Sequence, residues 1–330
     1  MDLSTTYLGL ELPHPFMGGA SPLTRDLDLV RRLEDAGSAA IVMHSLFEEQ
    51  IAREPAVARR VIEVRGEPTA RSPLPEAHEY ALGPEEYLEQ VRRIREAVSV
   101  PVVASLNGTT PGSWLEYASL LEEAGAHALE MNVYLVATDP KETSLDVEDR
   151  VVEIVRGAVE QVDIPVAAKL GPHYSALANF ARRLEVAGVK GLVLFNRFHQ
   201  PDIDVDERDV SPKVTLSDSG ELLLRLRWLA ILSDRIAASL AVSGGVHETT
   251  DAVKAVMAGA HAVQMVSALL RSGPEHLRTV REGVSRWLVE RGYESMRALR
   301  GSMGLTRCPD PQAFERGHYL RVLQSWRGLV

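Results

Sequence analysis

One lysine in the chain ends an unusually apolar segment. Lys169 follows Pro165-Val166-Ala167-Ala168, where an ammonium group without a partner would be poorly solvated. An anionic or electron-accepting ligand is a natural partner for it, whereas snorkelling to solvent or pairing with Glu130 is the structural alternative. We therefore predict that Lys169 is a catalytic residue that also contacts a bound cofactor.

Small residues follow two later apolar segments. Ser243-Gly244-Gly245 leads into a predicted helix that begins near Thr249, and Val266-Ser267 follows the last apolar segment. Backbone amides that small residues leave exposed, aimed at a helix N-terminus, stabilise a dianion. We predict that these two turns hold a phosphate group.

Polar residues or glycine end nearly all the other apolar segments as well. Such groups are costly to bury without partners, so their collection at one end of a sheet marks the site of a polar ligand. We predict that the Asn132 and Asn196 amides contact substrate and that Asn132 also contacts the cofactor, although both could be structural hydrogen-bonders. The other predicted cofactor contacts are Gly19, Ala20, Ser21, His44 and Ser105.

Eight apolar segments must position these residues, and each is expected to be a strand. They alternate with amphipathic stretches of helical spacing, and four of those stretches end in Ala-Gly before the next strand. Buried strands separated by helices form a parallel sheet, and eight such units close into a (β/α)₈ TIM barrel, with an open doubly wound sheet as the alternative. The expected strands lie near residues 16–19, 39–44, 102–106, 128–133, 166–170, 191–195, 240–243 and 262–265.

The predicted α/β fold is a single domain over residues 1–330 with two long insertions. Residues 48–83 follow the second strand and residues 200–220 follow the sixth, so both belong to the rim of the barrel at the carboxyl ends of its strands. The expected helices are 85–98, 113–124, 147–162, 176–187, 222–237 and 249–258.

Composition restricts the function to small-molecule chemistry. A formal net charge of −10 argues against nucleic acid or an anionic membrane as partner. The N-terminal residues lack a basic flank and an apolar run, and Cys308 is the single cysteine, so we expect a cytoplasmic protein. The histidines and carboxylates show no metal-ligand spacing, and we predict no metal site.

The order of these motifs resembles the dihydroorotate dehydrogenase family over nearly the full length. The resemblance rests on residues 14–21, Glu130-Met131-Asn132, Ala168-Lys169-Leu170, the two phosphate turns and residues 292–295. It implies FMN as cofactor, hydride transfer to the flavin as in pyrimidine biosynthesis, and a homodimer. It also makes Asn196 a substrate contact. Electrons would leave through a soluble acceptor or a partner subunit.

Two positions depart from that family. The family has a lysine where this chain has His44, and its catalytic cysteine or serine base corresponds to Leu135, which accepts no proton. A positioned base contributes a factor of about 10²–10⁴, so another residue must substitute, and His44 and Tyr134 are the predicted candidates. The aligned loop that carries an asparagine in the family reads Glu76-Ala77-His78-Glu79-Tyr80, so the substrate can differ from dihydroorotate.

Arg225 and Arg227 follow Ser219-Gly220-Glu221-Leu222, where the family has a glycine-rich turn. Each arginine could bind an anion or lie on a solvated face. The leading hypothesis is an FMN-dependent oxidoreductase. The alternatives are a non-catalytic barrel that binds FMN or a phosphate ligand, which Leu135 favours, and an aldolase-type lyase with Lys169 as Schiff-base nucleophile.

Overall fold

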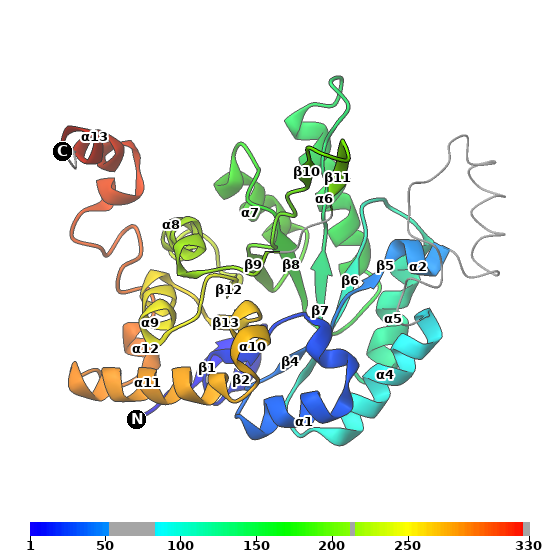
Figure 1. Cartoon of the computed structure of the whole chain (residues 1–330), viewed down its shortest axis with the longest axis horizontal. Helices are drawn as coiled ribbons and strands as arrows, with labels where there is room; N and C mark the ends of the chain where they lie inside the picture. The colour runs from blue at the N-terminus through cyan, green and yellow to red at the C-terminus, as the bar shows by residue number, and fades with distance from the viewer. Residues whose placement is uncertain (53–82, 212–214, 326–330) are drawn as a thin grey trace.

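Eight parallel strands close into a barrel. The computed structural model describes residues 1–52, 83–211 and 215–325 (Figure 1). Each barrel strand pairs with the next in chain order, and β13 pairs with β3 to complete the ring. The predicted TIM barrel is therefore confirmed, and the open sheet is wrong. The strands are β3 (Phe16–Gly18), β4 (Ile41–Val42), β6 (Val102–Asn107), β7 (Ala128–Asn132), β8 (Val166–Leu170), β9 (Gly191–Leu194), β12 (Ser239–Ser243) and β13 (Ala262–Met265).

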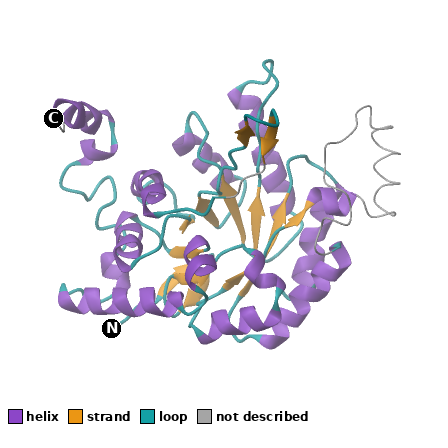
Figure 2. Cartoon of the chain, viewed as in Figure 1, coloured by secondary structure: helices purple, strands orange, loops and turns teal. Residues whose placement is uncertain are grey.

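Helices cover the outer face of the barrel (Figure 2). Helix α7, for example, buries Leu177, Phe180, Ala181 and Leu184, whose spacing of three and four residues places them on one face. The predicted glycines at helix ends have positive φ angles, which a side chain would make costly. The covering helices are α1 (Leu27–Asp35), α4 (Pro84–Ala97), α5 (Glu116–Glu123), α6 (Ser144–Val159), α7 (Leu177–Val186), α8 (Leu222–Leu232), α9 (Thr249–Ala258) and α11 (His276–Glu290).

The amino-terminal end of the barrel is sealed by an antiparallel hairpin of β1 (Thr5–Tyr7) and β2 (Leu10–Leu12). Tyr7 and Leu8 pack against small apolar residues that face the barrel interior. A side chain at Gly191 would collide with Leu8, so a glycine there lets the hairpin seat closely. Because this end is dry and apolar, the polar site lies at the opposite, carboxyl end of the strands.

Both predicted insertions follow strand ends on the rim. After β4 the chain forms β5 (Leu46–Phe47) and α2 (Glu48–Ala52), and residues 53–82 of that insertion, with the stretch 76–80, lie outside the described residues. After β9 it forms a hairpin of β10 (Asp202–Asp204) and β11 (Asp209–Ser211), followed by the short helix η4 (Ser219–Glu221). Short helices η1 (Pro22–Arg25) and η3 (Ser113–Leu115) lie in other loops.

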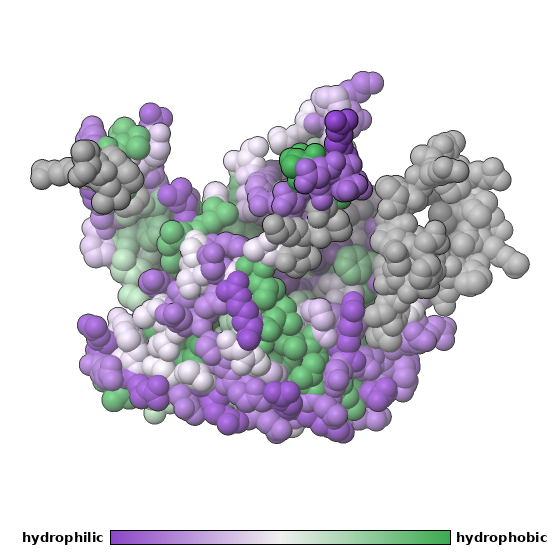
Figure 3. Space-filling model, in the orientation of Figure 1, coloured by the Kyte–Doolittle hydropathy of each residue, from purple (hydrophilic) through white to green (hydrophobic). Residues whose placement is uncertain are grey.

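After β13 the chain passes through α10 (Ser267–Ser272) and α12 (Met296–Leu299), whose buried apolar side chains belong to the main core. It continues through η5 (Pro311–Phe314) to α13 (Arg316–Ser325), which stands apart in Figures 1 and 3. Within the described ranges, no helix combines the length and the apolar character needed to cross a membrane. The single domain over residues 1–330 stays a prediction.

Candidate active site

A buried ionic group fills the barrel just below the carboxyl ends of its strands. Lys169 Nζ of β8 lies 3.0 Å from Glu130 Oε1 of β7, and Gln264 Nε2 of β13 donates to Glu130 Oε2 at 2.6 Å. The Lys169 and Glu130 side chains are only 6% and 1% exposed. Glu130 thus stabilises Lys169 in the interior, and the pairing that the sequence left as an alternative is the observed contact.

Gln264 was not among the predicted site residues. It is polar at an inward position within the apolar strand Ala262–Met265, and this signal could have identified it. Its Oε1 atom is buried and has no hydrogen-bond partner in the described residues. A bound group that carries an N–H donor would satisfy this atom.

The end of β3 lies directly against β13. The Gly19 amide donates to the Met265 carbonyl at 3.0 Å. A Cβ at Gly19 would lie 2.8 Å from Val266 Cγ2 and 3.0 Å from Gln264 Cβ, so this close approach requires glycine. The structure therefore brings the predicted cofactor contacts Gly19 and Val266 together, and Ala20 and Ser21 continue the chain from there.

His44 lies at the end of β4 in a closed environment. Its Nδ1 is 3.1 Å from Thr24 Oγ1, and the Tyr87 ring packs edge-on at 5.0 Å. Burial, with a smaller effect of Arg25, lowers the pKa of His44 from 6.5 to about 4. The ring is neutral at pH 7, so it does not replace the positive charge of the family's lysine and is a weak base.

This pKa links His44 to the stability of the fold. Between pH 6.5 and about 4 the unfolded chain binds a proton at His44 that the folded chain does not. The contribution to stability is therefore complete above pH 6.5 and is lost as the pH falls toward 4. On going from pH 7 to pH 5, we expect the free energy of unfolding of His44→Gln to fall by about 1–2 kcal/mol less than that of wild type.

Urea denaturation at the two pH values measures this difference. His199→Gln is the matched control, because the His199 side chain is exposed, and it should keep the wild-type dependence. An unchanged pH dependence in His44→Gln would show that the neutral ring is not what the fold requires. His14 and His261 have the same lowered pKa of about 4 and remain in both variants.

The two predicted substrate amides are in contact. Asn196 Nδ2 donates to Asn132 Oδ1 at 3.0 Å across the ends of β9 and β7. The pair leaves the Asn132 amino group and the Asn196 oxygen for a ligand. Ser105, also a predicted contact, is fully buried and bonds to Ser45 Oγ at 2.8 Å, which fixes the β6 end beside β4.

A cavity of about 290 Å³ opens beside this amide pair, above β7, β8 and β9. Its described lining is mostly aromatic and aliphatic, includes His173 and Asn196, and holds neither lysine nor arginine. The predicted catalytic residue Tyr134 lies in it, and its hydroxyl accepts from the His199 amide at 3.1 Å. Leu135, where the family resemblance predicts a replaced base, also lines the cavity. The lining is Val133, Tyr134, Leu135, Val136, Ala137, Val147, Gly171, His173, Tyr174, Asn196 and Phe198.

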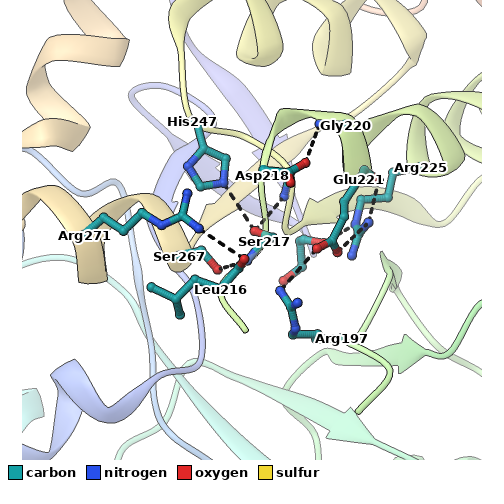
Figure 4. Close-up of polar contacts among 12 residues, drawn as sticks. Arg197, Leu216, Ser217, Asp218, Gly220, Glu221, Arg225, His247, Ser267 and Arg271 are labelled. Atoms are coloured by element: carbon teal, nitrogen blue, oxygen red, sulfur yellow. Dashed lines mark hydrogen bonds and ion pairs between the residues drawn. The ribbon is translucent and has the colours of Figure 1, made fainter. Parts of the chain in front are cut away.

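The two predicted phosphate turns lie side by side, connected by a residue of the second rim insertion (Figure 4). The Gly245 amide donates to Ser217 Oγ at 3.2 Å, and the Ser217 amide donates to Ser267 Oγ at 3.0 Å. Gly244 and Gly245 have φ angles of +82° and +80°. The Gly245 amide thus points at an oxygen acceptor, the kind of atom that a phosphate also presents.

Three arginines surround these turns, as Figure 4 shows. Arg225 is buried and donates to the Ser243 carbonyl at 2.5 Å, and Arg271 donates to the Leu216 carbonyl at 3.2 Å. Arg197 Nη1 lies 3.3 Å from the Glu221 carboxylate. Arg225 therefore supports the turn at residues 243–245, whereas Arg227 is exposed on α8.

The α9 N-terminus differs from the sequence expectation. Asp251, in the first turn of α9, accepts hydrogen bonds at 3.1 Å from the His247 and Glu248 amides. Its carboxylate also accepts from Ser219 Oγ at 2.6 Å. The chain's own carboxylate therefore occupies this helix end, and a phosphate at the Gly245 amide would take the place of Ser217 Oγ.

Other sequence expectations concern residues outside this group. Cys308 is buried in the C-terminal segment, where its Sγ lies 3.6 Å from the Leu305 carbonyl. Within residues 1–52, 83–211 and 215–325, no three histidine, cysteine or carboxylate side chains converge as metal ligands.

Comparisons with known proteins identify the family of the chain. A sequence model of the family described as dihydroorotate dehydrogenase matches residues 3–288. A protein of Aeropyrum pernix assigned to dihydroorotate dehydrogenase A (fumarate) is 35% identical over 62% of this chain and 68% of its own length. The catalytic subunit of dihydroorotate dehydrogenase B (NAD(+)) of Pyrococcus abyssi is 28% identical over 91% of this chain and 98% of its own length. The NAD-dependent dihydropyrimidine dehydrogenase subunit PreA of Escherichia coli is 25% identical over 91% of this chain and 76% of its own length.

Proposed function

Because the chain belongs to the dihydroorotate dehydrogenase family, we propose that it is an oxidoreductase with FMN as its cofactor. Relatives named for dihydroorotate and for dihydropyrimidine dehydrogenation make a CH–CH bond of a small ring the expected site of oxidation. The observation that carries the proposal is the placement of Lys169, Gly19 and the two phosphate turns around one end of the barrel.

The residues present fit an FMN. The Gly245 amide and the Ser267 turn would hold its phosphate in the place that Ser217 occupies between them, with Arg225 fixing the Ser243 carbonyl. The ammonium of Lys169 would stabilise negative charge on the ring, and the unpaired Gln264 Oε1 could accept from a ring N–H. When bound, FMN supplies a two-electron acceptor for a hydride.

The substrate pocket is the cavity beside Asn132 and Asn196. The amide pair would orient a planar ring through its own amide groups, and the aromatic walls would exclude water from it. Orotate carries a carboxylate, and the described lining offers no arginine or lysine to balance that charge. We therefore propose an uncharged dihydropyrimidine-like ring in preference to dihydroorotate.

The aldolase-type alternative has less support. A Schiff base requires a free amine, and Lys169 Nζ is engaged in an ion pair with Glu130 at 3.0 Å. The non-catalytic alternative rests on Leu135 and is decided by the experiment below. For electron transfer we propose a soluble acceptor or a partner subunit, and the homodimer stays a prediction from the family resemblance.

Anaerobic mixing tests this function. FMN-loaded protein is mixed with 5,6-dihydrouracil or with dihydroorotate, and bleaching of the flavin absorption is followed. We expect faster bleaching with dihydrouracil. Flavin that is retained but reduced by neither compound, while dithionite reduces it, would favour the non-catalytic alternative.

A further inference from the structure

The loop after β8 brings an imidazole to the substrate cavity. His173 lies four residues beyond Lys169 and lines the same cavity as Leu135 and Asn196. Its ring packs edge-on against Phe198, with centroids 4.5 Å apart at an interplanar angle of 73°. Its exposed side chain can exchange protons with solvent, a property that a recycling acid–base group requires.

The other candidates for proton transfer are each less suited. Leu135 accepts no proton. His44 does not line the cavity, its Nδ1 is 3.1 Å from Thr24 Oγ1, and burial makes its ring a weak base. The Tyr134 hydroxyl is directed to the His199 amide. Burial and Glu148 raise the pKa of Tyr174 to about 12, so it stays protonated near neutral pH.

We propose that His173 is the catalytic base of this active site and takes the place of the residue that Leu135 replaces. The inference rests on the proposed function, since it needs a substrate that gives a hydride to FMN. The C–H bond beside the substrate carbonyl breaks and its proton goes to the imidazole. A bound FMN would supply the two-electron acceptor for the hydride of the adjacent carbon, so that a C=C bond forms between the two carbons.

The surroundings of His173 allow this role. The titratable side chains that line the cavity with His173 are Tyr134 after β7 and Tyr174 on its own loop. The His199 amide donates to the Tyr134 hydroxyl from the loop after β9. Behind Tyr174, Glu148 of α6 forms an ion pair with Arg183 at 3.1 Å. Among side chains, an imidazole exchanges protons most readily near neutral pH. Because a general base acts only in its unprotonated form, the reduction rate should rise with pH.

The test compares flavin reduction by 5,6-dihydrouracil or dihydroorotate in FMN-loaded wild type and His173→Gln from about pH 5.5 to 9. We expect the variant to be slower by about 10²–10⁴ and to lose the rise with pH, with unchanged FMN content and unchanged reduction by dithionite. His199→Gln is the matched control and should keep the wild-type profile, because its side chain is exposed and outside this cavity.

Two further variants separate chemistry from structure. Free imidazole should partly restore the rate of flavin reduction in His173→Ala. Adding Leu135→Cys to His173→Gln should also partly restore this rate, because it returns a base to the position where the family has one. A rate of flavin reduction in His173→Gln within a factor of about three of the wild-type rate, with the same pH profile, would overturn the inference and leave the proposed function intact.

Failure of the proposed function looks different. A wild-type protein that retains no FMN would overturn the function and the inference with it. Bound FMN that dithionite reduces but neither ring compound reduces would contradict the inference, because the base would then have no substrate in this cavity.

Discussion

Lys169→Met is expected to abolish flavin reduction and to lower the free energy of unfolding by about 3–5 kcal/mol. The stability loss arises because the fully buried Glu130 loses the ammonium that lies 3.0 Å away. The Gln264 amide, which donates to Glu130 at 2.6 Å, remains but carries no charge. Removing the positive charge of Lys169 from beside the flavin ring should separately slow flavin reduction by a factor of about 10²–10³. Urea denaturation and anaerobic rapid mixing measure the two effects.

A second substitution distinguishes these effects. Glu130→Gln in the Lys169→Met background removes the unpaired carboxylate and should recover most of the stability, whereas flavin reduction should stay slow. Lys190→Met is the matched control, because Lys190 is exposed at a helix-to-strand turn, and both quantities should stay at the wild-type level. Recovery of reduction in the double variant would show that Lys169 serves the fold alone.

Gly245→Ala is expected to weaken FMN binding about 10- to 150-fold, the equivalent of one hydrogen bond to a charged group. Gly245 has a φ angle of +80°, which a side chain disfavours. An added Cβ would lie 2.6 Å from the Leu222 amide nitrogen and 2.8 Å from Leu222 Cα. Because backbone atoms cannot rotate away, the turn must shift and its amide loses the phosphate. Fluorescence titration with FMN measures the affinity.

Riboflavin and a second glycine provide the controls. Riboflavin has the same ring without phosphate, so its affinity should be nearly the same in Gly245→Ala and in wild type. Gly292 has a φ angle of +71° and no atom within 4 Å of an added Cβ, so Gly292→Ala carries the backbone strain without the collision. Equal weakening of FMN and riboflavin would argue against a phosphate at this turn.

The barrel itself was predictable from the sequence because its signals are local. An apolar run followed by a polar tip marks each buried strand, and Gly37, Gly125, Gly188 and Gly259 mark helix ends whether or not the rest of the fold is known. The tips also led to the predictions for Lys169 and for the two turns expected to bind phosphate, whose roles stay predictions. The Glu130 pairing could be only an alternative, because whether one inward residue meets another depends on the register of β7 and β8.

The remaining site residues depend on contacts between distant segments. Ser217 reaches the phosphate turns from the rim insertion after β9, and no local pattern places it there. His173 lies beyond a strand tip, where the loop path decides which cavity it lines. The Asp251 carboxylate occupies the N-terminus of its own helix and so competes with a phosphate for the amides there. The glycine motif before this helix gives no sign of that competition. Gln264 is the polar residue within the otherwise apolar strand Ala262–Met265, a pattern visible in the sequence. It lies inside the strand and not after its end, where the predicted site residues were placed.

The absorption spectrum of the protein after incubation with FMN and removal of free ligand tests the central claim most directly. We expect one FMN per chain, with flavin bands shifted from those of free FMN by the charge of Lys169 and the buried surroundings. A colourless protein after this treatment, with the fold intact by circular dichroism, would contradict the assignment of a flavin site to this barrel.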